Sequence, residues 1–458
     1  MEVGTSGPGE LFPPSYGQRA LWFLQKLAPS LTAYNLRYAG RVTPPLSGAT
    51  WRRAFQALAD RHAVLRTTYP MVEGRPWQWI QPRRAIDFEE VDAAAWSEAE
   101  VDERLAREAQ TPFDLENGPV VRLRVLGRDA DHAVVFFSLH HVAADLFSIA
   151  HLLDELGLFL AVEESGEQVF LDEPEAHPGD FARWEESFLA GDGAAEQWAY
   201  WTARLADLPP LDLPTDRPRP PARRFRGDVL RFALGEPRAR LRALAEAERV
   251  GFEVVLLALF QVLLGSIGGR DEVVLGWPAP GRPEPRFEKT VGYFINPIVL
   301  RGTCDRTRTF RRHVDHARQV LDEALEKQNL PFPLLVERLL PKRDSGRSPL
   351  YQVLLTLVDD ADARLARLFG GGAGGVELGP VTFEPRVVSR AGAMLDLAIN
   401  GIDAGGTLTI GFEWDTDLFE RATVEGWAER CRRLFAAAAA DPDRSLDELV
   451  RISMDGGS

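Results

Sequence analysis

The sequence predicts an α/β protein made of two units of similar size, joined by a proline-rich connector. At 458 residues the chain is longer than one average domain, and its 45% apolar and 26% charged residues are ordinary for a globular protein. The connector, Leu208–Pro221, contains six prolines. Proline fixes φ and removes a backbone donor, so this segment can form neither a helix nor a central strand.

The first unit is assigned to residues 12–178, after a glycine- and proline-rich start, 1–11, that we interpret as a flexible linker. Its apolar spacing predicts these elements in order: helix 17–24, helix 49–60, strand 64–69, strand 120–126, strand 133–140 and helix 146–162. The run Ala133–His140 is continuously apolar up to its end, which is typical of a strand buried on both faces.

Residues 179–225 are predicted to hold a pair of bridging helices and the connector, and residues 226–455 the second unit. The second unit is expected to contain strand 228–233, helix 236–249, helix 253–264, strand 272–276, strand 407–414 and helix 425–439. The glycine run 370–375 predicts a mobile loop, and no Lys-Ser/Thr follows it as in a phosphate loop. Two such units imply a cleft between them, a common place for an active site.

Composition excludes several classes of function. A net charge of −15 leaves no basic excess to neutralise phosphates, so we expect no nucleic-acid partner. Cys304 and Cys431 form neither a disulfide framework nor a cluster with metal-ligand spacing. His313 and His316 are expected on an exposed helix, and no metal site is predicted. Without a signal peptide or a membrane-length apolar run, we expect a soluble cytoplasmic protein that does not bind membranes.

The segment Ser138–Asp145 carries the candidate chemistry, because a histidine pair precedes an aspartate where a buried strand ends before a helix. Imidazole titrates near neutral pH, so it can take a proton from an attacking amine or hold that amine in place. Asp145 can fix the loop through a salt bridge or backbone hydrogen bonds. On the residues alone, His140 and His141 are equally well explained as two polar residues that end a strand.

Seven motifs in order along nearly the whole chain resemble those of condensation domains from nonribosomal peptide synthetases. They are Ser15–Trp22, Arg61–Thr67, His140–Asp145, Asp180–Trp184, Val291–Asn296, Lys327–Phe332 and Arg343–Leu350. Four positions depart from the family pattern: Ala63 stands for Glu, Leu146 for Gly, Asn329 for Asp and Gly346 for Ser.

The resemblance implies two chloramphenicol-acetyltransferase-like lobes in a V-shaped pseudo-dimer, with a tunnel between them. It implies an acyltransferase that forms an amide bond between an upstream acyl thioester and a downstream aminoacyl amine. Both substrates would be carried on the phosphopantetheine arms of partner carrier proteins, beside neighbouring synthetase domains. No cofactor or metal is expected to be held by the domain itself, which we expect to be monomeric when excised.

The resemblance also assigns roles to residues. His141, the second histidine of the core motif, is the predicted catalytic residue, which orients or deprotonates the nucleophile or stabilises the tetrahedral intermediate. His140 and Asp145 are expected to support the loop. Asp145 is expected to pair with an arginine from the start of the second lobe, and Arg282 is the candidate.

Four residues are predicted to line the tunnel: Leu146, Ser148, Trp277 and Asn296. Leu146-Phe-Ser148 resembles a variant found in condensation domains that polyketide modules supply, which favours a polyketide over a peptidyl donor. Trp277 would narrow the tunnel or pack beneath a loop. Asn296 would line the tunnel or pack below it.

Other functions of the same superfamily remain open. Heterocyclisation domains replace the histidine pair with aspartate, and epimerisation domains need a further acidic residue that we do not find. A free-standing ester- or amide-forming acyltransferase is one alternative. The other is a non-catalytic condensation-like platform that docks tailoring oxidases, although such platforms usually lose the core histidine, which here is His141.

Overall fold

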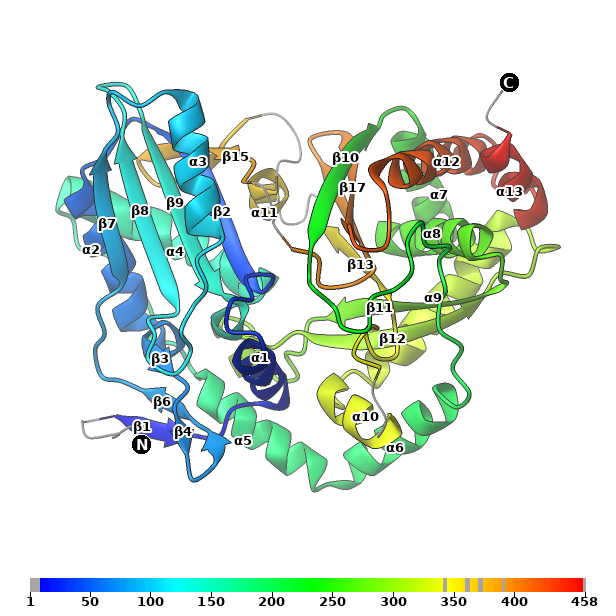
Figure 1. Ribbon diagram of the computed structural model, residues 1–458, viewed down its shortest axis with the longest axis horizontal. Helices are drawn as coiled ribbons and strands as arrows, with labels where there is room; N and C mark the ends of the chain where they lie inside the picture. The colour runs from blue at the N-terminus through cyan, green and yellow to red at the C-terminus, as the bar shows by residue number, and fades with distance from the viewer. Residues whose placement is uncertain (1–8, 341–343, 359–362, 370–373, 389–391, 456–458) are drawn as a thin grey trace. The chain divides into compact units, whose positions relative to one another are not determined.

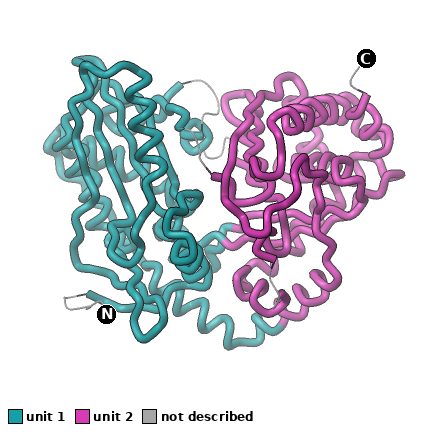
Figure 2. The backbone as a smooth tube through the Cα atoms, in the orientation of Figure 1, with its two compact units in different colours: residues 1–195, 280–295, 362–391 teal, residues 196–279, 296–361, 392–458 magenta. Residues whose placement is uncertain are grey.

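The chain folds into two units, each assembled from three separate stretches of sequence (Figures 1 and 2). The computed structural model describes residues 9–340, 344–358, 363–369, 374–388 and 392–455. Unit 1 comprises residues 1–195, 280–295 and 362–391, and unit 2 comprises 196–279, 296–361 and 392–458. The sequence predicted two contiguous lobes, so two segments expected in the second lobe belong instead with the first.

A six-stranded sheet forms the centre of unit 1. Its strand order is β14 (Val376–Leu378), β15 (Val381–Arg386), β2 (Asn35–Thr43), β9 (Ala133–His140), β8 (Val121–Gly127) and β7 (Asp87–Asp92). Only the β7–β8 pair is parallel among these described strands. Every residue of β9 is buried, which confirms the prediction of a strand buried on both faces.

Helices cover both faces of this sheet (Figure 1). The helices of unit 1 are α1 (Tyr16–Leu27), α2 (Gly48–Arg61), α3 (Glu98–Ala109), α4 (Leu146–Ser165), α5 (Pro178–Leu189) and α11 (Ala363–Leu368). Serine caps begin three of them, because the hydroxyls of Ser15, Ser47 and Ser97 accept backbone N–H groups that the first turn leaves free. On one face, Val101 and Leu105 of α3 pack against Phe136 of β9.

The predicted strand 64–69 is wrong for most of its length. Ala63–Arg66 forms a 3-10 turn, in which Leu65 N donates to His62 O at 3.0 Å, and only Thr67–Thr68 continues as strand β3. β3 joins a small sheet with β1 (Glu10–Phe12) and β6 (Gln78–Ile80), beside the hairpin of β4 (Met71–Val72) and β5 (Arg75–Pro76). The predicted linker 1–11 therefore ends in a strand, and its first eight residues lie outside the described residues.

The segment that holds β14 and β15 joins unit 1 because β15 pairs antiparallel with β2 and extends its sheet. A close backbone approach secures it on α4. A Cβ on Gly157 of α4 would lie 2.8 Å from the backbone nitrogen of Gly379 in the β14–β15 turn. Only glycine at this position lets the helix and the turn meet. The predicted mobile loop 370–375 lies largely outside the described residues.

Unit 2 has a mixed six-stranded sheet. Its order is β10 (Gly227–Leu234), β17 (Thr407–Asp415), β16 (Leu397–Ala404), β13 (Val353–Val358), β11 (Glu272–Ala279) and β12 (Asn296–Thr303). Strand β13 is parallel to both of its neighbours. The predicted strands 228–233, 272–276 and 407–414 are confirmed within these bounds.

Seven helices among the described residues begin in or near unit 2: α6 (Asp192–Arg204), α7 (Pro237–Glu248), α8 (Phe252–Gly268), α9 (Phe310–Glu326), α10 (Phe332–Leu339), α12 (Arg421–Ala440) and α13 (Leu446–Met454). Most side chains of α8 are buried, as its apolar sequence predicts. No single helix in the described part of the chain has the length and apolar character to span a membrane, although α7 and α8 pass that test as a pair bent by 113°.

The connector 208–221 contains neither helix nor strand, as its prolines predict. It is tied to unit 2 at several points. Leu211 N donates to Gln352 Oε1 at 3.0 Å, and Asp216 N donates to Leu418 O at 3.0 Å. Arg219 forms a bidentate ion pair with the buried carboxylate of Asp396. The connector is therefore an ordered strap within unit 2.

Candidate active site

The candidate site lies in unit 1, where β9 ends. His140 is the last residue of β9, His141–Ala143 forms a single 3-10 turn, and Asp145 caps α4. The backbone N–H of His141 donates to Tyr34 O at 2.8 Å, which anchors the turn beside β2. A buried strand and a capped helix thus hold the histidine pair from both sides.

The orientation of the His141 ring gives its two nitrogens different roles. Nδ1 lies 2.7 Å from the carbonyl oxygen of Ala144. Because a carbonyl can only accept, Nδ1 carries the proton and Nε2 carries the lone pair in the neutral ring. Burial lowers the pKa of His141 below its usual 6.5, against the opposing effects of Ala144 O and Asp145. At neutral pH, His141 Nε2 is a proton acceptor.

The ring of Tyr293 packs nearly perpendicular to the ring of His141, at a centroid distance of 5.1 Å and an interplanar angle of 88°. Burial raises the pKa of the Tyr293 hydroxyl, which stays protonated. A Cβ on Gly17, in α1, would lie 2.6 Å from the Tyr293 ring. Glycine at position 17 therefore leaves room for the ring of Tyr293. Sequence reasoning assigned no role to Tyr293.

His140 supports the turn. Its side chain is completely buried, and Nδ1 accepts a hydrogen bond from Val142 N at 3.1 Å. Burial lowers the pKa of His140 to about 3, so the ring is neutral at physiological pH. The supporting role expected for His140 stays a prediction, and these contacts are the observations that favour it.

Asp145 and Arg282 form a buried ion pair. Arg282 Nη1 donates to Asp145 Oδ2 at 2.8 Å, and Nη2 donates to Oδ1 at 2.9 Å. Asp145 also accepts from Ser148 N at 2.9 Å and from Phe294 N at 3.1 Å. The predicted pairing is present, but Arg282 belongs to the 280–295 segment of unit 1, whereas it was expected at the start of the second lobe. Both carboxylate oxygens of Asp145 therefore accept hydrogen bonds that hold the structure together.

Ser148 completes this network. Its hydroxyl lies 2.8 Å from Asp145 Oδ1 and 2.9 Å from Gly292 O, and it accepts from Gly292 N at 3.0 Å and Arg282 Nη2 at 3.1 Å. The residue is 1% exposed. Ser148 was predicted to line a substrate tunnel, but its hydroxyl is taken up by contacts within unit 1.

Aromatic rings enclose the guanidinium of Arg282. Its Cζ lies 4.5 Å from the ring centroid of Phe294 and 5.3 Å from that of Phe147. Leu146, beside Phe147 at the first turn of α4, is half-buried. Phe294 in turn packs with Phe181 of α5 and with Phe287. The 280–295 segment is thus fixed by an ion pair at one point and by an aromatic cluster at another.

Two further buried residues position α1: Gln18 joins it to the histidine turn, and Glu185 joins it to α5. Gln18 Nε2 donates to Tyr69 Oη at 3.1 Å and lies 3.5 Å from Val142 O in the histidine turn. Glu185 of α5 accepts from Tyr16 N, at the start of α1, at 2.8 Å. Burial raises the pKa of Glu185 to about 7.

Two of the predicted tunnel residues lie in unit 2. Trp277 is half-buried on β11, opposite Ile298. Asn296 begins β12, and its Nδ2 donates to Gln328 O at 2.7 Å and Leu330 O at 2.8 Å, while its Oδ1 accepts from Phe332 N at 2.8 Å. The amide of Asn296 is therefore bonded to the turn before α10, which favours packing over lining.

The prediction that His313 lies on an exposed surface is wrong. His313 is fully buried, its Nε2 lies 3.8 Å from Cys304 Sγ, and burial lowers its pKa to about 3. Both cysteines are free and buried. Burial raises the pKa of the Cys304 thiol to about 12.

A neutral histidine with a free acceptor nitrogen, on a rigid turn at the end of a buried strand, defines a site for acid–base chemistry on an α/β scaffold. The model of the condensation domain family matches residues 11–455. The chain belongs to this family, the condensation domains of nonribosomal peptide synthetases, which catalyse amide-bond formation.

The curated relatives include chondramide synthase cmdD from Chondromyces crocatus, which is 32% identical over 96% of this chain. The chain spans 11% of that synthase. Its fold resembles a solved four-domain nonribosomal peptide synthetase, holo-AB3403, with a TM-score of 0.86, 23% identity, and coverage of 97% of this chain and 34% of that one.

It also resembles the X-domain from teicoplanin biosynthesis, solved in complex with OxyB, with a TM-score of 0.82, 24% identity and 97% of each chain covered. The predicted α/β, chloramphenicol-acetyltransferase-like fold is confirmed by this likeness to condensation domain structures. The tunnel expected between the lobes stays a prediction.

Proposed function

We propose that this chain catalyses amide-bond formation between an upstream acyl thioester and the amine of a downstream aminoacyl thioester, each borne on the phosphopantetheine arm of a partner carrier protein. The observation that carries the proposal is the state of His141. Its Nδ1 donates to Ala144 O at 2.7 Å, and this leaves Nε2 as a lone-pair acceptor in a ring that burial keeps neutral.

In the proposed reaction, the amine nitrogen attacks the thioester carbonyl carbon while His141 Nε2 holds or accepts an N–H proton. The tetrahedral intermediate collapses with cleavage of the C–S bond. The proton leaves with the thiol of the upstream arm, and the amide remains on the downstream carrier. Bonds and protons balance without a resident cofactor or metal. Asp145 and His140 act only by holding the turn.

A more specific proposal, about the identity of the upstream acyl donor, rests on Leu146. It occupies the first helical position after the Asp145 cap, where the family pattern has glycine, and it is half-buried. A branched side chain there is larger than the glycine of the family pattern and adds an apolar group one residue after Asp145. This favours a reduced, apolar acyl chain such as a polyketide over a peptidyl donor.

The test uses this chain with two loaded carrier proteins and follows acyl transfer by intact-protein mass spectrometry. We expect the acyl mass to move to the acceptor carrier with the native protein, and to move far more slowly with His141→Ala. The matched control is His132→Ala, which removes a partly exposed histidine paired with Asp129. It should transfer at the native rate.

Two outcomes would contradict the proposal. Transfer to a free amine or alcohol, but not to a loaded acceptor carrier, would indicate a free-standing acyltransferase. No transfer from any donor, together with stable binding of a tailoring oxidase, would indicate a docking platform. The intact His141 argues against the platform.

A further inference from the structure

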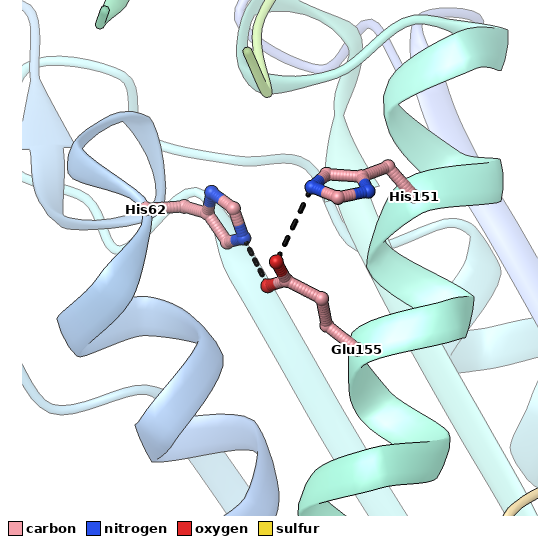
Figure 3. A group of neighbouring side chains, drawn as sticks. All are labelled: His62, His151 and Glu155. Carbon is pink, nitrogen blue, oxygen red and sulfur yellow. Dashed lines mark hydrogen bonds and ion pairs between the residues drawn. The ribbon is translucent and has the colours of Figure 1, made fainter. Parts of the chain in front are cut away.

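A second group of ligand-type side chains lies in unit 1, at the end of α2 and on α4 (Figure 3). His62 follows the last residue of α2, while His151 and Glu155 lie on α4. Residues four apart share a helix face, so the α4 pair projects together toward the end of α2. Figure 3 shows both imidazoles directed at the Glu155 carboxylate.

The three donor atoms are close together. His62 Nε2 lies 2.6 Å from Glu155 Oε2, His151 Nε2 lies 3.2 Å from Oε1, and all three ligand atoms lie within 4.8 Å of one another. Zinc binds imidazole nitrogen and carboxylate oxygen at about 2.0–2.2 Å, so tetrahedral ligands are roughly 3.3–3.5 Å apart. The observed separations, from 2.6 Å to at most 4.8 Å, lie on either side of this value.

We propose that His62, His151 and Glu155 form a binding site for a divalent transition-metal ion, with Zn²⁺ as the best-suited ion. Two imidazoles and one carboxylate are a ligand set that zinc accepts, and three protein ligands leave a fourth position for water. The side chain of His151 is 27% exposed, whereas those of His62 and Glu155 are 2% and 5% exposed. The ion would therefore enter past His151.

Arg61 provides the outer shell of this site. Its Nε donates to both Glu155 oxygens, at 2.9 and 3.1 Å. When one oxygen binds the metal, Arg61 retains its hydrogen bond to the other and orients the carboxylate, as outer-shell partners of metal ligands do. The positive charge of Arg61 opposes that of the ion, so affinity should be below that of a site without it.

A metal ion bound at this site would have a structural role. It would join the end of α2 to α4, the helix that Asp145 caps beside His141. The metal takes no part in the proposed acyl transfer. Sequence reasoning predicted no metal site, because His62 is 93 residues from Glu155 and no short ligand spacing marks the set.

The test is titration of the full chain, stripped with a chelator, with Zn²⁺ in a calorimeter. We expect one ion per chain and a raised melting temperature. His151→Ala, at the most exposed ligand, should weaken binding by at least the ~10–100-fold that follows loss of an outer-shell partner. Glu155→Gln keeps the side-chain shape and should weaken binding as well. His132→Ala should bind as the native chain does.

Cobalt supplies a second measurement. Co²⁺ in the native chain should give the visible d–d absorption of a tetrahedral site, and His151→Ala should not. Far-ultraviolet circular dichroism verifies that each variant is folded. Absence of stoichiometric Zn²⁺ binding by the native chain would overturn the proposal, as would equal binding by native and His151→Ala proteins. Neither result depends on acyl transfer.

Discussion

Arg282 donates hydrogen bonds to both carboxylate oxygens of Asp145, at 2.8 and 2.9 Å, across 137 residues of sequence. The side chains are 7% and 0% exposed, so the pair is withdrawn from solvent. Because Phe294 N also donates to Asp145, the pair fixes the 280–295 segment and with it Tyr293, which packs on His141. One ion pair therefore orders both the loop that bears the catalytic candidate and the segment that covers it.

Arg282→Ala should lower the free energy of unfolding by about 3–5 kcal/mol, because it leaves the Asp145 carboxylate buried and unpaired. Urea denaturation measures the change. Arg286→Ala is the matched control. It removes an arginine of the same segment whose ion pair with Glu284 is exposed, and it should cost less than about 1 kcal/mol. Equal effects of the two variants would show that the Asp145–Arg282 pair does not hold the segment.

The proposal that His141 accepts a proton predicts how the rate of acyl transfer depends on pH. Since burial lowers the pKa of His141 below 6.5, the neutral ring predominates at pH 7 and is lost only under more acidic conditions. The transfer rate, measured under single-turnover conditions, should be level around neutral pH and fall as pH drops through an apparent pKa below 6.5.

In His141→Ala, the acidic limb should disappear and the rate should fall by about 10²–10⁴, the usual contribution of a general acid–base residue. A profile of the same shape in this variant would assign the titration to another group. His132→Ala again serves as the control and should keep the native profile.

Local patterns were sufficient to predict β9 and the turn that follows it, because an unbroken apolar run before two histidines depends on few distant contacts. They failed at residues 64–69, where a 3-10 turn bonded to His62 replaces most of the strand. The role of Arg282 came from family resemblance, and its contact with Asp145 could not be read from spacing.

Sequence patterns could not predict how the chain divides into two units, and the reason is physical. β15 belongs with β2 through cross-strand pairing, and the 280–295 segment belongs with α4 through the Asp145 ion pair. Both depend on contacts between distant parts of the chain, which periodicity does not encode. Tyr293 and Glu185 were missed for the same reason, since each gains its role only from the tertiary neighbour it meets.

Glu185 should make stability depend on pH. Burial raises its pKa from the usual 4.5 to about 7 in the folded chain. Between these values the folded state holds a proton that the unfolded state has released, so the contribution of Glu185 to stability falls as pH rises through this window and is constant above it. The size is about 3 kcal/mol.

Urea denaturation across this pH range measures the effect. Glu185→Gln should remove this part of the pH dependence, whereas Glu186→Gln, at the exposed neighbouring position, should retain it. Parallel pH profiles for native and Glu185→Gln proteins would show that the carboxyl group titrates normally.

Leu146 is the position at which donor choice can be tested. Leu146→Gly restores the family residue and removes the branched apolar side chain that follows Asp145. It should shift the ratio of peptidyl to polyketide transfer by about tenfold or more, the scale on which small changes of apolar pocket volume act. Glycine in a helix also costs up to about 1 kcal/mol of stability.

Leu158→Gly, at a partly exposed site on the same helix, incurs a comparable helix cost without changing the surroundings of His141. Competition between two donor carriers, measured by mass spectrometry, separates the two effects: the ratio should move only in Leu146→Gly. If both variants leave the ratio unchanged, Leu146 packs the first turn of α4 and donor choice is determined elsewhere.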